Sequence, residues 1–110
     1  MFSGKKAALI PIYEKLVEIL FALGKDIKVC PGKTIVPIYR KHVMAQIKPS
    51  TNTRIDFGLA LKGTKFTKRL LDTGGLARKD RITHHVEITL IGHIDDDVRK
   101  WLRRAYEMDE

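Results

Sequence analysis

The stretch that decides the fold reads HVMAQIK at residues 42–48, PSTNT at 49–53 and RIDFGLAL at 54–61. Apolar and polar residues alternate in the first and third parts, as they do in strands with one buried face. The polar middle part separates these two runs in the manner of a hairpin loop. We therefore predict an antiparallel hairpin with these inward side chains: Val43, Ala45, Ile47, Ile55, Phe57, Leu59 and Leu61.

Both ends of the chain carry the apolar spacing of amphipathic helices. In residues 10–23 apolar side chains recur every three or four positions, and Pro11 suits the first turn. Gly24 is expected to end this helix in a left-handed conformation. A second helix is predicted to begin at Asp95, whose carboxylate can cap the first turn. Its apolar stripe consists of Val98, Trp101, Leu102 and Ala105.

Three further runs, residues 27–30, 34–39 and 83–91, favour strands on either side of the hairpin. Because Pro37 cannot donate to a strand ladder, its strand should lie at a sheet edge or carry a bulge. Residues 62–81 show little periodicity and are interpreted as a long connection.

The predicted fold is a two-layer α+β domain. Its antiparallel sheet has about five strands, with the N- and C-terminal helices on one face and the order α-β-β-β-β-loop-β-α. A chain of 110 residues suits a single domain over residues 1–110, with a flexible N-terminus at about residues 1–6.

The composition excludes several classes of protein. There is no apolar run of about 18 residues, so no membrane-spanning helix is expected. The first apolar stretch runs into Glu14 and Lys15, which is not typical of a signal peptide. Cys30 stands alone, so no internal disulfide can form, and we expect a cytoplasmic protein with a buried thiol.

Positive charge is the most informative feature of the composition. The chain has 21 Lys and Arg against 13 Asp and Glu, and residues 62–81 hold seven of the basic residues but two of the acidic ones. A clustered basic segment fits a polyanion such as nucleic acid, although loops also carry Lys and Arg for solubility alone. The candidate polyanion-binding residues are Lys65, Lys68, Arg69, Arg78, Lys79 and Arg81.

The cations of the last helix are predicted to be neutralised within that helix. Asp95 lies four residues before Arg99, and Asp96 four residues before Lys100, which is the favourable orientation for intrahelical pairs. The two arginines at 103–104 suit the negative end of the helix dipole.

The outward face of the predicted sheet gathers polar groups that could form a site. If both helices cover the other face, this one is open to solvent or to a partner. The candidates on it are Gln46, Arg54, Asp56, His85 and Glu87. Asp56 and Glu87 could approach each other on neighbouring strands, as metal-dependent hydrolysis requires, but a mixed polar face is also typical of a merely solvated surface.

No metal site, other cofactor or catalytic residue is predicted. His84 and His85 are adjacent on a strand and point to opposite faces, so they cannot both bind one ion without a bulge. Zinc needs three or four converging ligands, and Cys30 lies in a distant segment.

The element order and several short motifs resemble a known family. The motifs are YEKL at residues 13–16 leading to Gly24, the hairpin from Val43 to Gly63, and VEI at 86–88 before a helix that closes on Ala105 and Tyr106. Over about residues 7–108 the chain is similar to a family of small uncharacterised prokaryotic domains of unknown function. Some members are labelled "predicted transport protein", and others are joined to nuclease-like domains. The resemblance implies a fold and no site residues.

Three functions remain open on this evidence. The leading hypothesis is a non-enzymatic accessory module that contacts nucleic acid or another polyanion non-specifically through residues 62–81. The second is a protein–protein interaction module, which docks an acidic protein or self-associates through an edge strand near Ile35–Tyr39. The third is a small-molecule or enzymatic site on the open sheet face around Asp56, His85 and Glu87.

Overall fold

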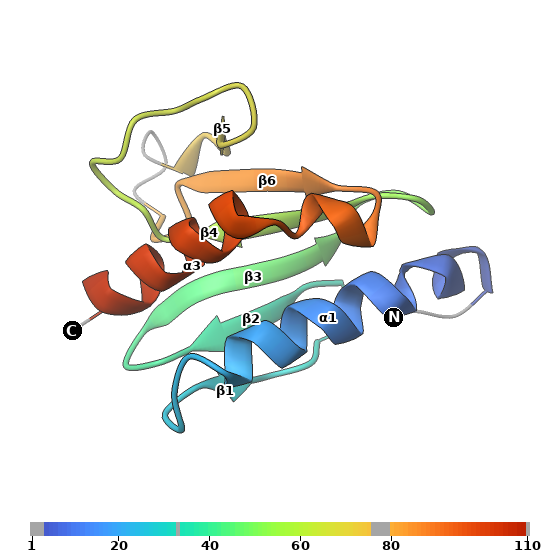
Figure 1. Ribbon diagram of the computed structural model, residues 1–110, viewed down its shortest axis with the longest axis horizontal. Coiled ribbons are helices and arrows are strands. Elements are labelled where there is room, and N and C mark those ends of the chain that lie inside the picture. The colour runs from blue at the N-terminus through green and yellow to red at the C-terminus, as the bar shows by residue number, and fades with distance from the viewer. Residues whose placement is uncertain (1–3, 33, 76–79, 110) are drawn as a thin grey trace.

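Within the residues that the structure describes, 4–32, 34–75 and 80–109, a computed structural model shows six strands in one antiparallel sheet (Figure 1). They are β1 (Lys28–Val29), β2 (Val36–Tyr39), β3 (Val43–Pro49), β4 (Ile55–Leu59), β5 (Leu71–Asp72) and β6 (His84–Ile88). Their order across the sheet is β1-β2-β3-β4-β6-β5, so β1 and β5 form its edges. The predicted α+β class is confirmed, with β5 as a strand that the sequence pattern does not predict.

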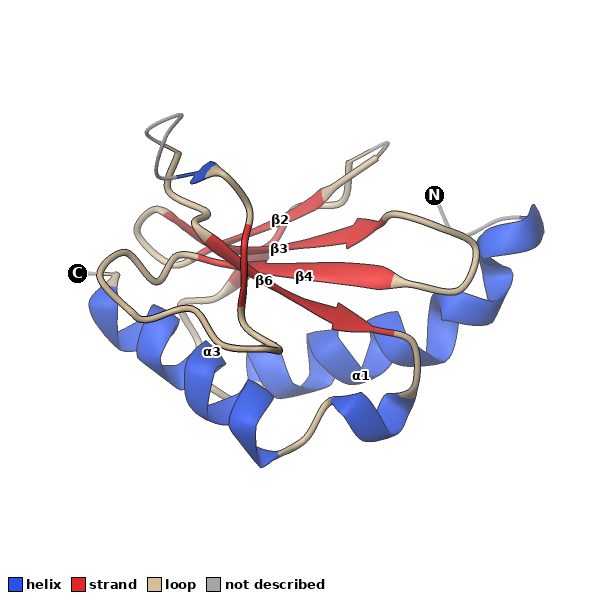
Figure 2. Ribbon diagram, turned by 90° about the horizontal axis from the view of Figure 1, so that it is seen from above, coloured by secondary structure: helices blue, strands red, loops and turns tan. Residues whose placement is uncertain are grey.

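Both long helices cover one face of the sheet, as Figure 2 shows. A 3₁₀ helix, η1 (Gly4–Leu9), leads into α1 (Ile10–Phe21), and another, η2 (Ile91–His93), precedes α3 (Asp96–Met108). Leu16 of α1, Phe57 of β4 and Leu102 of α3 are fully buried between the helices and the sheet. The predicted two-layer arrangement is therefore confirmed.

The two ends of the N-terminal helical region differ from the sequence prediction. Residues 4–6, expected to belong to a flexible N-terminus, lie in η1, and Lys6 Nζ donates to the Pro49 carbonyl at 2.8 Å. The prediction of a left-handed Gly24 is wrong, because the described glycines with positive φ are Gly63 and Gly74. A Cβ at Gly24 would instead collide with the Tyr106 hydroxyl and come within 2.8 Å of Asp26 Oδ1, so glycine suits the close approach of this loop to α3.

A β-bulge reverses the predicted orientation of two residues in β3. Ile38 of β2 pairs with Ala45, but the next residue, Tyr39, pairs with Val43, so Met44 is an extra residue in β3. Met44 and Ala45 are consequently both buried in the core, whereas Val43 is half-buried and lines a hollow on the other face. The expectation that Val43 points inward and Met44 outward is wrong because one inserted residue shifts the two-residue period.

The strand with Pro37 is not an edge strand. Val29 of β1 pairs with Ile38, and Cys30 N donates to the Pro37 carbonyl at 3.1 Å. Proline is tolerated because its missing N–H faces the short β1, just where that strand ends. The predicted free edge near Ile35–Tyr39 is therefore wrong, since β1 covers it.

The segment between β4 and β6 wraps around one edge of the sheet. Figure 2 shows that residues 60–70, the segment before β5, run on the side of the helices, whereas the described residues directly after β5 lie on the opposite side. The cations of this segment are thereby divided between the two faces of the molecule.

Candidate functional site

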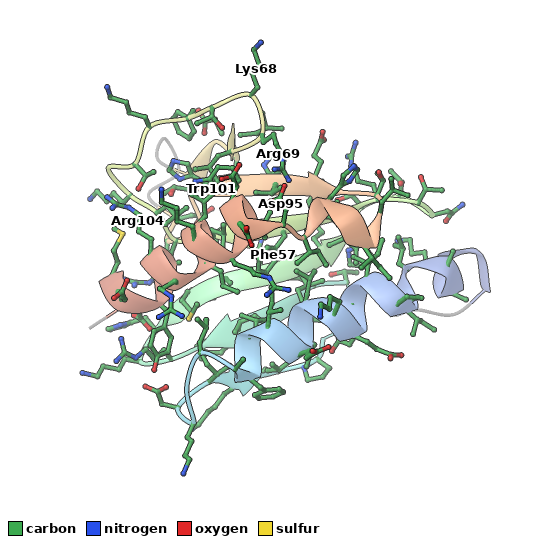
Figure 3. The ribbon with its side chains drawn as sticks, in the orientation of Figure 1. Phe57, Lys68, Arg69, Asp95, Trp101 and Arg104 are labelled. Atoms are coloured by element: carbon green, nitrogen blue, oxygen red, sulfur yellow. The ribbon has the colours of Figure 1, made fainter. Side chains whose placement is uncertain are left out.

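Arg69, one of the predicted polyanion-binding residues, is bound within the protein. Its Nη1 lies 2.7 Å from Asp95 Oδ2, and its Nη2 donates to the His93 carbonyl at 2.9 Å. Its guanidinium carbon lies 5.9 Å from the centroid of the Trp101 ring. Figure 3 shows Arg69 close to Asp95 and Trp101, whereas Lys68 projects away from the body of the protein. Arg69 thus anchors the segment before β5 to α3.

Arg81 is held in the same way at the other end of α3. Its Nη2 lies 3.2 Å from Asp109 Oδ1, and its Nε donates to the Val43 carbonyl at 3.2 Å. Asp109 is 1% exposed, and its Oδ2 accepts the backbone N–H groups of Lys41 and His42 at 2.9 Å each. Burial raises the pKa of Asp109, but the hydrogen bonds from His42 and Lys41 outweigh it and hold that pKa below its usual range.

The remaining predicted cations of this segment fall into two groups. Lys65 and Lys68 are exposed and form no ion pair with any residue in the described part of the chain, and the same holds for Lys62. Arg78 and Lys79 lie outside the described residues. The structure therefore neutralises two of the six predicted residues through carboxylates that are distant in the sequence, and it leaves Lys65 and Lys68 available.

The predicted ion pairs within α3 are not formed. Asp95 is engaged by Arg69, and within the described residues no ion pair joins Asp95 to Arg99 or Asp96 to Lys100. The prediction for Asp95 is wrong because its two carboxylate oxygens are engaged by Arg69 Nη1 and by the Val98 N–H. Asp96 forms no ion pair with any described residue.

The cations of α3 consequently belong to the same exposed surface as the lysines of that segment. Lys100, Arg103 and Arg104 are exposed at helical spacings of three and four, so they share the outer face of α3. Arg104 Nε donates to Thr64 Oγ1 at 2.9 Å, which ties the two elements together. We call this set the basic surface; its residues are Lys62, Lys65, Lys68, Lys100, Arg103 and Arg104.

His84 holds the segment before β5 against the sheet, a role that the sequence does not predict. The residue is fully buried, and its Nε2 lies 2.8 Å from the Thr64 carbonyl while its Nδ1 lies 2.6 Å from Thr83 Oγ1. A carbonyl can only accept, so Nε2 carries a proton and donates to Thr64. The Phe66 ring stacks on the imidazole with centroids 4.4 Å apart. The lysines of this segment are thus presented from a fixed backbone.

A second cluster ties the end of α3 to the loop after α1 and to Arg40. Tyr106 Oη donates to Asp26 Oδ1 at 2.7 Å, and Arg40 Nε donates to Asp26 Oδ2 at 2.9 Å. The Arg40 guanidinium also lies 4.2 Å from the centroid of the Tyr106 ring. The hydrogen bonds from Arg40 and Tyr106 lower the pKa of Asp26, and the one to Asp26 raises the pKa of Tyr106. These groups bind one another, so their role is structural.

The open face of the sheet brings together the predicted sheet-face residues. β4 and β6 pair Asp56 with Glu87 and Gly58 with His85. Arg54 bridges the two acids, with its Nε 3.1 Å from Asp56 Oδ1 and its Nη1 3.2 Å from Glu87 Oε2. The acids of this cluster therefore already face one positive charge.

A hollow of about 270 Å³ adjoins this cluster, lined by Gln46, Lys48, Asp56, Gly58, Asp72, Thr73 and His85. One ligand-type atom from each of Asp56, His85 and Glu87 lies within 4.8 Å of the other two.

The prediction that the Cys30 thiol is buried is wrong. Cys30 is exposed, because β1 ends at Val29 and Cys30 follows it outside the strand. It is also distant in the sequence from the sheet-face cluster.

Among the described residues, every helix is too short or too polar to cross a lipid bilayer.

The fold and its surfaces define a small basic α+β domain in which two helices cover one face of an antiparallel sheet. The chain belongs to DUF5655, a family described as a domain of unknown function, which matches residues 1–109. The resemblance to a family of domains of unknown function is thereby confirmed, and the match carries no information on transport or on nuclease-like domains. Comparisons with curated proteins and with solved structures found no match.

Proposed function

We propose that this protein is a non-enzymatic module that binds duplex nucleic acid through the basic surface, without reading its sequence. The observation that carries the proposal is the pairing state of its cations. The side chains of five of the six residues of the basic surface have no hydrogen bond or ion pair with any described residue, and the Arg104 side chain contacts only a neutral hydroxyl. Unpaired cations are free to neutralise phosphates.

The rigid placement of the segment before β5 supports this proposal. His84, Arg69 and Arg104 fix that segment to β6 and α3, so its exposed lysines and the outer cations of α3 keep a constant spacing. A preorganised row of cations loses less conformational entropy on binding than a loose loop does.

The aromatic residues near the basic surface favour duplex over single-stranded nucleic acid. The Phe66 ring is stacked on His84, and the Trp101 ring lies beneath the Arg69 guanidinium. Single-strand binders stack successive bases on several free aromatic rings. Here Arg69 covers the Trp101 ring, and Phe66, 42% exposed, offers one ring face. Contacts to the duplex backbone require only cations.

Fluorescence anisotropy with a labelled duplex of arbitrary sequence tests the proposal. If about six phosphates are contacted, the affinity should fall by about a thousandfold between roughly 50 and 200 mM salt. Failure to bind at low salt, or an affinity that does not change with salt, would overturn the proposal. Equal binding of polyglutamate would also overturn it, because the surface would then accept any acidic polymer.

Matched charge variants locate the surface. Each Lys→Glu or Arg→Glu change lowers the net charge by two, so a double variant carries +4 in place of +8. The double variant Lys65→Glu/Lys68→Glu should weaken duplex binding and reduce the slope of log affinity against log salt concentration by roughly two. The control Lys25→Glu/Lys28→Glu has the same net charge but lies near the β1 edge, opposite β5 in Figure 1. An equal loss in both double variants would mean that only net charge matters.

A further inference from the structure

The sheet face that points away from the helices carries three metal-ligating side chains on two adjacent strands. Asp56 of β4 is directly paired with Glu87 of β6, and His85 lies two residues before Glu87 on the same strand. Residues two apart on a strand share a face, so all three side chains stand on the open side of the sheet. This placement depends on strand register and not on a flexible loop.

The spacing of these groups is close to that of a coordination site. The ligand-type atoms of Asp56, His85 and Glu87 lie within 4.8 Å of one another. An ion held about 2.1 Å from each atom needs them about 3.4 Å apart, so the side chains must rotate when the ion enters, and the half-exposed Glu87 side chain has room to do so. The hollow of about 270 Å³ beside Asp56 and His85 leaves room for a water molecule or a small ligand in an open coordination position.

Two polar groups of this cluster, the His85 imidazole and Asp56 Oδ1, lack a hydrogen-bond partner among the described residues and so can bind an ion. The His85 imidazole has no hydrogen bond to any described residue, whereas the imidazoles of His42, His84 and His93 each have at least one. Oδ1 of Asp56 is buried and accepts no well-aligned hydrogen bond, although Arg54 Nε lies 3.1 Å from it.

The other oxygen of Asp56 is fixed. Ser50 Oγ donates to Asp56 Oδ2, which orients the carboxylate so that Oδ1 faces the cluster. Hydrogen bonds of this kind, from residues that do not touch the ion, position the ligands in many metal sites.

We propose that Asp56, His85 and Glu87 bind a divalent transition-metal ion, with Arg54 as a competing internal cation. One imidazole and two carboxylates form a mixed donor set that suits Zn²⁺ or Mn²⁺ better than Ca²⁺. Arg54 contacts both carboxylates and must move aside when the ion enters. This site lies on the sheet face opposite the helices and is independent of the proposed nucleic-acid surface.

Isothermal titration calorimetry with Zn²⁺ tests the site on the full chain. We expect one equivalent to bind, and Asp56→Asn and His85→Gln should each weaken binding by at least about tenfold. Arg54→Gln should strengthen binding by about tenfold or more, because it removes a positive charge from the two carboxylates. If the three side chains formed only a structural ion-pair cluster, Arg54→Gln would not strengthen Zn²⁺ binding.

Two control variants exclude other zinc ligands. Cys30→Ser removes the exposed thiol, and His93→Gln removes a histidine outside the cluster; both should bind as the parent protein does. Co²⁺ provides a second readout, since its absorption spectrum reports the ligand set. The proposal is overturned if the parent protein binds no Zn²⁺, if binding survives Asp56→Asn and His85→Gln unchanged, or if either control abolishes it.

Discussion

Arg69 and Asp95 lie 26 residues apart in the chain and meet through an Nη1–Oδ2 contact of 2.7 Å. The second oxygen of the same carboxylate, Oδ1, accepts the Val98 N–H at 3.2 Å and so caps α3. One side chain therefore both starts the C-terminal helix and fastens the segment before β5 to it. Asp95 is therefore not available to Arg99, the cation of α3 that local spacing assigns to it.

Substitutions at Asp95 separate its two roles. Asp95→Ala removes the cap and the ion pair and should lower the free energy of unfolding by about 1–2 kcal/mol. Asp95→Asn keeps an oxygen for the Val98 N–H and should cost less than about 1 kcal/mol, because a half-exposed ion pair contributes little. Urea unfolding at neutral pH measures both. Equal losses in the two variants would show that the cap contributes nothing.

The buried His84 should keep the segment before β5 closed against the sheet. His84→Leu removes the donor to the Thr64 carbonyl and the stacking partner of Phe66, so that segment should open more often. Trypsin should then cleave after Lys65 and Lys68 roughly tenfold faster under native conditions, the equivalent of about 1.4 kcal/mol for a lost buried hydrogen bond.

His85→Leu is the matched control, since His85 is the next residue on β6 but faces the opposite side of the sheet. Its cleavage rate should remain that of the parent protein. Equal acceleration in both variants, with equal loss of global stability in urea, would attribute the effect to β6 as a whole and contradict the specific role of His84.

Regular periodicity made the helices and the central hairpin predictable. Leu16 and Phe57 lie in the core, as the three-to-four and two-residue spacings predict. The same reasoning failed at Met44, because a bulge is one irregular residue with no periodic signal of its own. It also missed β5, since two residues are too few to show alternation.

The charge pattern was less predictable for a related reason. Local spacing can propose a pair such as Asp96 and Lys100, but it carries no information on residues that meet only after folding. Asp109 reaches Arg81 and His42 across 28 and 67 positions, and no motif near the end of the chain signals it. In contrast, Asp56 and Glu87 were predicted to approach each other because strand alternation places both on one face.

Gly58, beside the sheet-face hollow, has no room for a side chain. A Cβ there would lie 2.7 Å from Ile82 Cγ2 and 2.8 Å from Gln46 Cγ. Gly58→Ala should therefore destabilise the protein by about 1–3 kcal/mol through overpacking. Gly92→Ala meets nothing within 4 Å and should change stability by less than about 0.5 kcal/mol. Similar thermal shifts in the two variants would contradict the packing argument.

Asp109 should make the stability of the protein depend on pH below neutrality. Its folded-state pKa lies below its usual value because hydrogen bonds from His42 and Lys41 outweigh the effect of burial. A depressed folded pKa stabilises the folded state above the unfolded pKa of about 3.9, and this contribution is lost as the pH falls through the folded pKa. Asp109→Asn should therefore cost about 2 kcal/mol at pH 7, the range for hydrogen bonds to a charged group, and less at pH 3.

Urea unfolding of both proteins at the two pH values measures this difference. Glu107→Gln, an exposed change on the same helix, should alter stability by less than about 0.5 kcal/mol at either pH. A penalty for Asp109→Asn that is the same at pH 3 and pH 7 would mean that the charge of Asp109 is not what holds the end of α3. In that case the contacts with Arg81 and His42 would act as neutral hydrogen bonds only, because a charge-dependent contribution must fade as the carboxylate becomes protonated.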